Sequence, residues 1–302
     1  MKLKITWYAL TNDGEGLYFE RDFMSLIYLQ LLLISIVTAL ACVLPGNFLV
    51  LRGTALMSDA LSHAILFGIV VTFLCIQDIN SPLIFIGTII SGILTVSITE
   101  VLTKTGKINQ DAAIGLTFPF LFSIAVILIN LFANNVHLDT DAILLGELAF
   151  APFQKLYFFG YDCGPTALWS MSIILCINIV CISYFYKELQ LTTFDPLYAK
   201  IMRYHPALFH YLLMVLTSIT IVQAFHTTGT ILVISFIVTP AATAFLLTKK
   251  LHEMIILSSL LAMIAVLLGF LIAHYYNISI AGSITLANGL IFLGIMSQTK
   301  EN

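Results

Sequence analysis

Nine long apolar stretches dominate this sequence and limit what it can fold into. They cover residues 25–44, 55–76, 83–102, 112–133, 166–186, 208–225, 229–247, 254–273 and 279–297. A helix needs about 20 such residues to cross the roughly 30 Å hydrocarbon core of a bilayer. Backbone groups in lipid must be satisfied within the segment, and the stretches lack the alternating polarity of β-barrel strands. The sequence therefore predicts an all-α polytopic membrane protein with eight or nine transmembrane helices.

Composition excludes several other classes of protein. Charged residues make up 10% of the chain, whereas soluble domains carry about 25%. The net charge of -3 argues against a nucleic-acid partner, because such a partner calls for a clustered basic surface. The 5 cysteines form no CxxC pair and predict neither disulfides nor a zinc ribbon. No G-x-x-x-x-G-K-S/T phosphate loop occurs, so the chain is not expected to be an enzyme, and any ATPase must be a separate chain.

The distribution of Lys and Arg predicts which helix ends face the cytoplasm, where membrane proteins carry an excess of these residues. If Arg52 faces the cytoplasm, strict alternation of the crossings places nine of the 13 Lys and Arg residues on that side. The C-terminus is then cytoplasmic, and the opposite side receives mainly acidic residues and histidines. The cytoplasmic cations are Arg52, Lys104, Lys107, Lys187, Lys200, Arg203, Lys249, Lys250 and Lys300.

Residues 25–298 are predicted to form a single transmembrane domain, since no gap between spans is long enough for a soluble one. Charges interrupt residues 1–24, which therefore do not resemble a cleavable signal peptide and are expected to lie along the membrane surface. The Pro45-Gly46 step is expected to end the first span. Between the fourth and fifth spans, residues 142–160 could form a re-entrant or interfacial helix.

Two charged residues, Asp59 and Glu100, fall inside the predicted spans. Glu100 lies two residues from the end of its span, where its side chain is expected to reach water. Asp59 lies deeper, and His63 follows it by four residues, so both side chains share one helix face with Cβ atoms about 5–6 Å apart. A charge in hydrocarbon is costly, and such residues usually line a cavity or a path.

The surroundings of this pair leave three roles open. A stripe of small residues beside it is expected to let another helix approach closely. One carboxylate and one imidazole suit Mn²⁺, Fe²⁺ or Zn²⁺, and a symmetric pair of subunits would supply four ligands. Asp59 and His63 could therefore form a metal path, a proton or substrate relay, or a structural hydrogen bond across a helix interface. The stripe consists of Ala60, Ala64, Gly68 and Thr72.

A series of ordered motifs runs along the chain. They are LVLR (49–52), SDALSHA (58–64), DAAIG (111–115), LGE (145–147), KEL (187–189), TFDPLYA (193–199), GTILV (229–233) and TPAATA (239–244). Together they resemble the permease subunits of ABC importers for manganese, zinc and iron, and the resemblance covers about residues 25–297. It implies the fold shared with the permeases of vitamin B12 importers.

The resemblance also implies a function and a set of partners. The chain would be the permease of an ATP-driven importer of a divalent metal ion (Mn²⁺, Zn²⁺ or Fe²⁺) in a bacterial cytoplasmic membrane. It would pair with a second copy or a related permease, above two cytoplasmic ATPases that bind the ATP. An extracytoplasmic binding protein would deliver the metal, which is a substrate rather than a stably bound cofactor.

Two sites carry over by position. Asp59 and His63 match the residues expected to contact metal in the translocation path. Residues 195–205 match the cytoplasmic segment that couples the permease to the ATPase. The expected coupling residues are Asp195, Pro196, Tyr198, Ala199, Lys200 and Arg203.

The sequence departs from the family pattern at two places. Leu66-Phe67-Gly68 replaces a Leu-Pro-Gly step, and loss of the proline is expected to straighten the helix. Residues 201–205 lack the glycine that usually follows the coupling segment. Two alternative functions are a proton-coupled transporter that uses Asp59 as its proton carrier, and an importer of an iron chelate or a cobalamin-like ligand.

Overall fold

The computed structural model describes residues 15–78, 81, 83–132, 148–158 and 161–299. Within these residues, nine helices are long and apolar enough to cross a membrane, which confirms the predicted fold class. The elements are α1 (Glu15–Leu51), α2 (Leu56–Ile76), α3 (Leu83–Lys104), α4 (Gln110–Phe132), η1 (Leu148–Phe153), β1 (Lys155–Phe158), β2 (Tyr161–Pro165), α6 (Thr166–Tyr184), α7 (Tyr186–Phe194), α8 (Pro196–Ile201), α9 (Pro206–Thr228), α10 (Thr230–Leu247), α11 (Leu251–Tyr276) and α12 (Ile280–Thr299).

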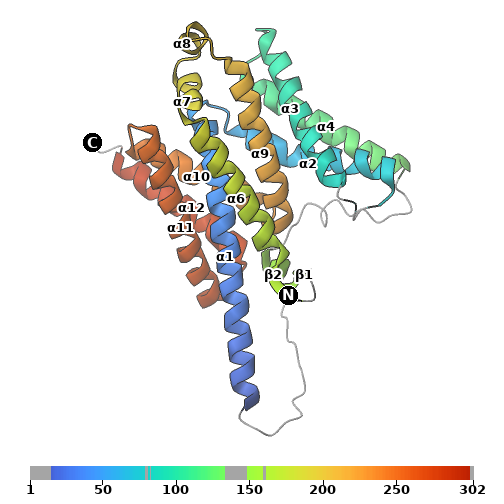
Figure 1. Ribbon diagram of the computed structural model, residues 1–302, viewed down its shortest axis with the longest axis vertical. Helices are drawn as coiled ribbons and strands as arrows, with labels where there is room; N and C mark the ends of the chain where they lie inside the picture. Colours follow the sequence, from blue (N-terminus) through green and yellow to red (C-terminus); the bar gives the residue numbers. More distant parts are fainter. Residues whose placement is uncertain (1–14, 79–80, 82, 133–147, 159–160, 300–302) are drawn as a thin grey trace.

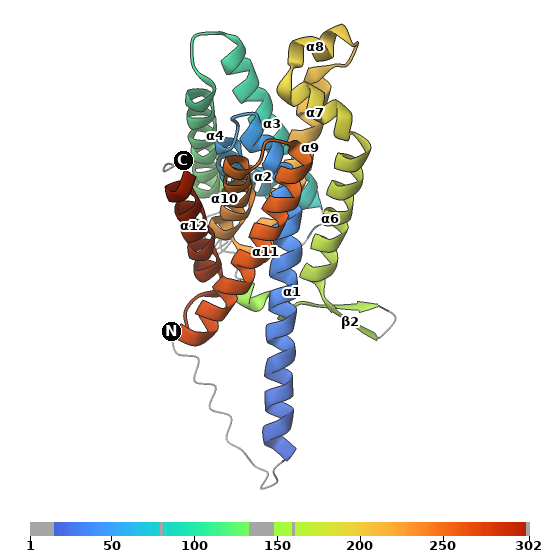
Figure 2. The same ribbon diagram turned by 90° about the vertical axis from the view of Figure 1, so that its left-hand side faces the viewer.

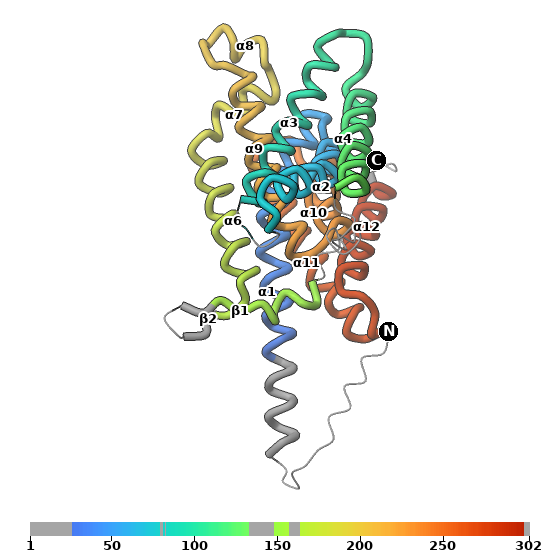
Figure 3. Tube along the Cα trace, turned by 90° about the vertical axis from the view of Figure 1, so that its right-hand side faces the viewer, coloured from blue at the N-terminus to red at the C-terminus, as the bar shows by residue number. Residues whose placement is uncertain are grey.

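The helices form one elongated bundle in which α1 contacts α6, α9, α10 and α11 (Figure 1). The short helices α7 and α8 lie at the same end of the bundle as the turn between α3 and α4 (Figures 2 and 3). The antiparallel β1–β2 hairpin lies towards the other end. This arrangement agrees with the placement of Lys104, Lys107, Lys200 and Arg203 on one side of the membrane.

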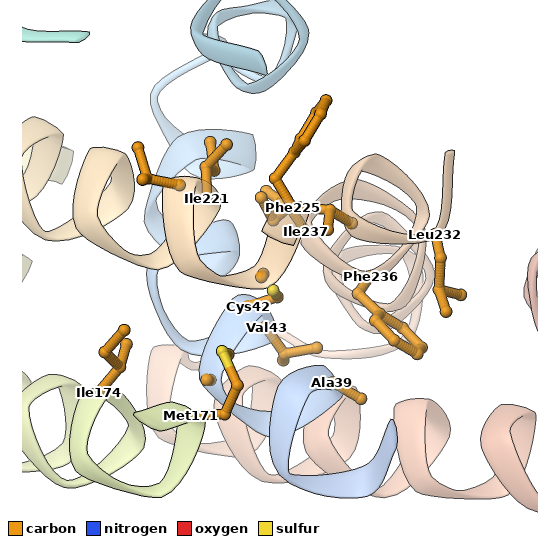
Figure 4. Close-up of a cluster of buried hydrophobic side chains, with 14 of the residues drawn as sticks. Ala39, Cys42, Val43, Met171, Ile174, Ile221, Phe225, Leu232, Phe236 and Ile237 are labelled. Atoms are coloured by element: carbon orange, nitrogen blue, oxygen red, sulfur yellow. The ribbon is translucent and has the colours of Figure 1, made fainter. Parts of the chain in front are cut away.

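The largest buried cluster joins helices that are far apart in the sequence (Figure 4). Within lipid, helices associate through close packing and interhelical hydrogen bonds rather than through a hydrophobic driving force. The labelled side chains accordingly interdigitate from α1, α6, α9 and α10. They are Ala39, Cys42, Val43, Met171, Ile174, Ile221, Phe225, Leu232, Phe236 and Ile237.

The Pro45-Gly46 step does not end the first helix, contrary to the sequence-based expectation, because α1 continues to Leu51. Proline cannot donate to the carbonyl four residues earlier, which here belongs to Ala41. Asn178 of α6 donates to that carbonyl through Nδ2 at 3.0 Å, and also contacts Thr220 Oγ1 at 2.9 Å. The neighbouring helices therefore satisfy the group that Pro45 leaves without a partner, as they must in a membrane interior.

Replacing Asn178 by Ala is expected to lower the free energy of unfolding by about 1–2 kcal/mol, because a buried carbonyl would lose its donor. Asn288 is a matched control, since this buried amide donates to a side-chain oxygen, Ser235 Oγ, at 3.1 Å. Thermal unfolding of the detergent-solubilised protein measures both effects. An Asn178→Ala shift no larger than that of Asn288→Ala would contradict the role assigned to Asn178.

The first helix also begins earlier than the apolar stretch that predicts it. Helix α1 starts at Glu15, so residues 15–24 are helical and continuous with the span, whose apolar part covers Leu26–Leu51. Residues 1–14 lie outside the described part of the chain. An N-terminal segment that follows the membrane surface therefore stays a prediction.

Only part of residues 142–160 lies within the described residues. Residues 148–153 form the 3₁₀ helix η1, which is followed by strand β1. Leu148, Ala151 and Pro152 are buried, and η1 contacts α1, α6 and α9. This stretch is thus a short turn packed against the helix bundle, and residues 142–147 lie outside the described part.

Candidate functional site

Asp59 and His63 lie in the first two turns of α2. Asp59 Oδ1 is 3.5 Å from His63 Nε2, and the side chains are 41% and 37% exposed, respectively. This distance is longer than a good hydrogen bond. The two groups therefore face the same space without fully satisfying each other, and both keep lone pairs available for a further partner.

The stripe of small residues on α2 packs against α3, which confirms the close approach predicted for it. Ser91 Oγ donates to the carbonyl of Ala64 at 3.0 Å. A Cβ atom on Gly68 would lie 2.7 Å from the Cα atom of Thr88, a distance shorter than Cβ atoms keep from other heavy atoms in proteins. Helix α2 itself contains no proline and runs unbroken from Leu56 to Ile76. Close packing on this face therefore leaves the Asp59–His63 face directed elsewhere.

The neighbours of His63 on that other face are aromatic residues of α4. The ring of Phe118 stacks on the imidazole with a centroid distance of 5.3 Å and an interplanar angle of 23°. Phe122 approaches it edge-on at 6.1 Å. Stacking of this kind restricts the rotamer of the imidazole. Sequence reasoning did not find these residues, although their i, i+4 spacing places both on one face of α4.

The predicted coupling segment contains the short helix α8. Asp195 Oδ1 accepts a hydrogen bond from the backbone N–H of Tyr198 at 2.9 Å, and Pro196 occupies the first helical turn. These are typical start signals of a helix. Ala199 is buried, whereas the other five predicted coupling residues are exposed at the end of the bundle (Asp195, Pro196, Tyr198, Lys200 and Arg203).

Arg203 explains how the segment turns without the glycine that is usual in the family. Its φ of 65° lies in the left-handed region. A glycine adopts that conformation more easily at the end of a helix. The backbone N–H of Tyr204 then bonds the carbonyl of Ala199 at 3.0 Å, which closes α8. The turn therefore forms although residues 201–205 lack the usual glycine.

Glu100 is less accessible to water than its position near the helix end suggested. Its side chain is 19% exposed and forms an ion pair with Lys104 at 2.8 Å. It also lines a pocket of about 390 Å³ together with His210 of α9. Because α9 packs against α3, the Glu100 side chain is largely covered although the last turn of α3 is partly exposed.

Among the described residues, no group of three or more His, Cys, Asp or Glu side chains could hold a metal ion. The described part of one chain therefore offers only two potential ligand groups at this site, those of Asp59 and His63. Two ligands do not complete the coordination that transition metals prefer.

Comparison with known proteins identifies the family. The profile of the ABC 3 transport family matches residues 24–299. The chain belongs to the ABC 3 transport family. This result confirms the resemblance that the motifs indicated, and with nine candidate spans the chain is a multi-pass membrane protein of that family.

Relatives in the ABC 3 transport family are similar over most of their length. A zinc transport system membrane protein, TroD of Treponema pallidum, is 44% identical over 87% of this chain and 72% of its own length. A manganese transport system membrane protein, MntD of Bacillus subtilis, is 38% identical over 88% and 90%. The relatives thus bear the names of two different metals.

Solved structures show the same fold. PsaBC from Streptococcus pneumoniae in complex with Fab matches with a TM-score of 0.70 and 32% identity, over 88% of this chain and 89% of that one. An ABC transporter described as of the metal-chelate type, in an inward-facing conformation, matches with a TM-score of 0.61 and 15% identity. This match covers 89% of this chain and 85% of the transporter chain, and it supports the fold alone.

Proposed function

We propose that this protein is the permease subunit of an ATP-driven importer of divalent transition metal ions. The observation that carries the proposal is the Asp59–His63 pair, a carboxylate and an imidazole 3.5 Å apart on a membrane-spanning helix. Such a pair suits Mn²⁺, Zn²⁺ or Fe²⁺. The zinc and manganese systems of the similar proteins support the same class of substrate.

The site is incomplete in one chain, and this bears on the mechanism. Two permeases facing each other would supply two carboxylates and two imidazoles, enough for transient coordination of one ion. The half-exposed side chains of Asp59 and His63 leave room for such a partner. Modest affinity suits transport, because the ion must leave the site again. A separate binding protein would deliver the metal from outside.

The ATPases would act from the end of the bundle that carries α7 and α8 (Figure 2). The exposed Lys200 and Arg203 offer positive charge to an acidic groove, and Leu197 offers an apolar contact. Binding and hydrolysis of ATP in those subunits would switch the permease pair between outward-open and inward-open states. The chain itself would supply the path for the metal ion, and the ATPase subunits would hydrolyse the ATP.

Reconstitution of the permease with its ATPase and its binding protein in proteoliposomes tests the proposal. We expect uptake of radiolabelled Mn²⁺, Zn²⁺ or Fe²⁺ that requires ATP and resists a protonophore. Uptake that persists without the ATPase and collapses with the protonophore would favour the alternative in which Asp59 carries protons. Uptake of a chelated iron or a cobalamin, but not of the free metal ions, would favour the alternative of an importer of an iron chelate or a cobalamin-like ligand.

Phe118 provides a prediction about the geometry of this site. Replacing it by Leu frees the imidazole of His63 and is expected to raise the KM for metal by about two- to tenfold, equivalent to the loss of about 0.5–1.5 kcal/mol of ring stacking. Phe120 lies on the same helix but is 59% exposed, so Phe120→Leu is the matched control. Equal KM values in the two variants would contradict a positioning role for Phe118.

A further inference from the structure

Arg52 is a largely buried cation in the turn between α1 and α2. Its Nε donates to Thr193 Oγ1 at 3.1 Å, and Nη2 donates to Thr192 Oγ1 at 3.3 Å. Nη1 contacts His210 Nδ1 at 3.3 Å. Burial lowers the pKa of Arg52 to about 10, so the guanidinium stays protonated at neutral pH.

The acceptors of Arg52 are arranged to receive this charge. The Thr192 and Thr193 hydroxyls both donate to the carbonyl of Leu189, which leaves their lone pairs for the guanidinium. A guanidinium only donates hydrogen bonds, so the Nδ1 atom of His210 must be the acceptor. Three N–H groups of Arg52 thus reach two helices, α7 and α9, in a fork that a lysine cannot reproduce.

The α7 end of this network leads directly to the coupling segment. Helix α7 ends at Phe194, and Asp195 alone separates it from α8. Leu189 is fully buried with Phe48 of α1 and Leu213 of α9. Helix α7 is therefore fixed to the bundle by an apolar cluster on one side and by Arg52 at its last turn.

The other end of the network leads to the Asp59–His63 pair. Arg52 lies four residues before Leu56, where α2 begins. The intervening turn is closed by backbone bonds from Thr54 to Leu49 at 2.9 Å and from Met57 to Thr54 at 3.0 Å. A displacement of Arg52 therefore moves the start of α2 rather than being absorbed by a loose linker.

We propose that Arg52 is a positioning residue that ties the α7–α8 segment to α2 and so transmits movement of the ATPases to the Asp59–His63 site. The inference rests on the proposed function, because α8 must contact the ATPase for Arg52 to transmit anything. It assigns to one side chain the physical link between a cytoplasmic contact and a site within the membrane. For such a link to couple the two sites, events at either site must shift the same structural equilibrium.

The test measures uptake and ATP hydrolysis together in proteoliposomes that contain the complete transporter, with the radiolabelled ion (Mn²⁺, Zn²⁺ or Fe²⁺) that the wild type imports as the probe. We expect R52Q and R52K to lower the amount of metal ion imported per ATP hydrolysed by about tenfold, within the range for a coupling residue. ATP hydrolysis itself should stay close to the wild-type rate. Thr193→Val removes one acceptor without touching the cation and should lower the ratio in the same direction but less.

Lys250→Gln is the matched control, since Lys250 is an exposed cation that pairs with Glu253 at 3.3 Å on α11. An unchanged import-to-hydrolysis ratio in R52Q would overturn the proposal. Parallel loss of uptake and hydrolysis in an assembled R52Q or T193V complex would also overturn it, because Arg52 would then serve docking. Absence of ATP-driven uptake of Mn²⁺, Zn²⁺ and Fe²⁺ alike in the wild-type transporter would instead overturn the proposed function.

Discussion

Replacing Asp59 by Asn, or His63 by Gln, is expected to reduce metal uptake by about 100-fold. Removing a group that only hydrogen-bonds a metal ligand already costs about 10- to 100-fold, and these two side chains are proposed to contact the metal directly. Both substitutions keep the size of the side chain and the helix, but the Asp59 variant loses its anionic oxygen and the His63 variant its imidazole nitrogen. In a symmetric pair of permeases each substitution removes two of four ligands. Uptake of radiolabelled Mn²⁺, Zn²⁺ and Fe²⁺ by the assembled transporter measures the loss and identifies the substrate.

A second carboxylate–imidazole pair in the chain provides the control. His252 Nε2 lies 3.8 Å from Glu253 Oε1 at the start of α11, and both side chains are exposed. His252→Gln and Glu253→Gln should leave uptake unchanged. Wild-type uptake in both the Asp59→Asn and the His63→Gln variants would mean that Asp59 and His63 have only a structural role. The family assignment would still stand, because it does not depend on these two residues.

The transmembrane helices could be predicted from sequence because hydropathy is a local property. The third span was expected at residues 83–102 and is found at Leu83–Lys104, and the seventh was expected at 229–247 and is found at Thr230–Leu247. The end of α1 was predicted wrongly for the opposite reason. The carbonyl that Pro45 leaves without a backbone donor is satisfied by Asn178, which lies 137 residues away in the sequence.

The same distinction separates what could and could not be predicted about the site. The Asp59–His63 pair follows from helix spacing alone, and their separation of 3.5 Å agrees with it. The stacking of Phe118 on His63 and the bond from Arg52 to Thr193 join segments that are distant in the chain. The exposure of Glu100 could not be predicted either, because it depends on where α9 packs. The stripe of small residues predicted that a helix would approach α2 closely, but which side chains meet across helices depends on the three-dimensional arrangement.

The most severe effect on folding is expected at Gly46, where α1 and α10 meet. A Cβ atom at this position would collide with the backbone carbonyl of Ile237 and lie 3.1 Å from its Cα atom. A flexible side chain could move aside, but the backbone of a packed helix can do so only if the whole of α10 shifts. Close approach of backbones at small residues is how membrane helices gain their packing energy.

Gly46→Ala is therefore expected to lower the free energy of unfolding by about 3 kcal/mol, the upper range for overpacking, and Gly46→Leu to prevent accumulation of folded protein. Gly115 of α4 is the matched control, since a Cβ atom there meets nothing within 4 Å. Gly115→Ala should even stabilise its helix by up to about 1 kcal/mol, because alanine favours helix over glycine. Thermal unfolding and gel filtration in detergent compare the variants. If Gly46→Ala proved as stable as Gly115→Ala, helix α10 would have to be free to move away from α1, and the tight α1–α10 contact could not hold the bundle together.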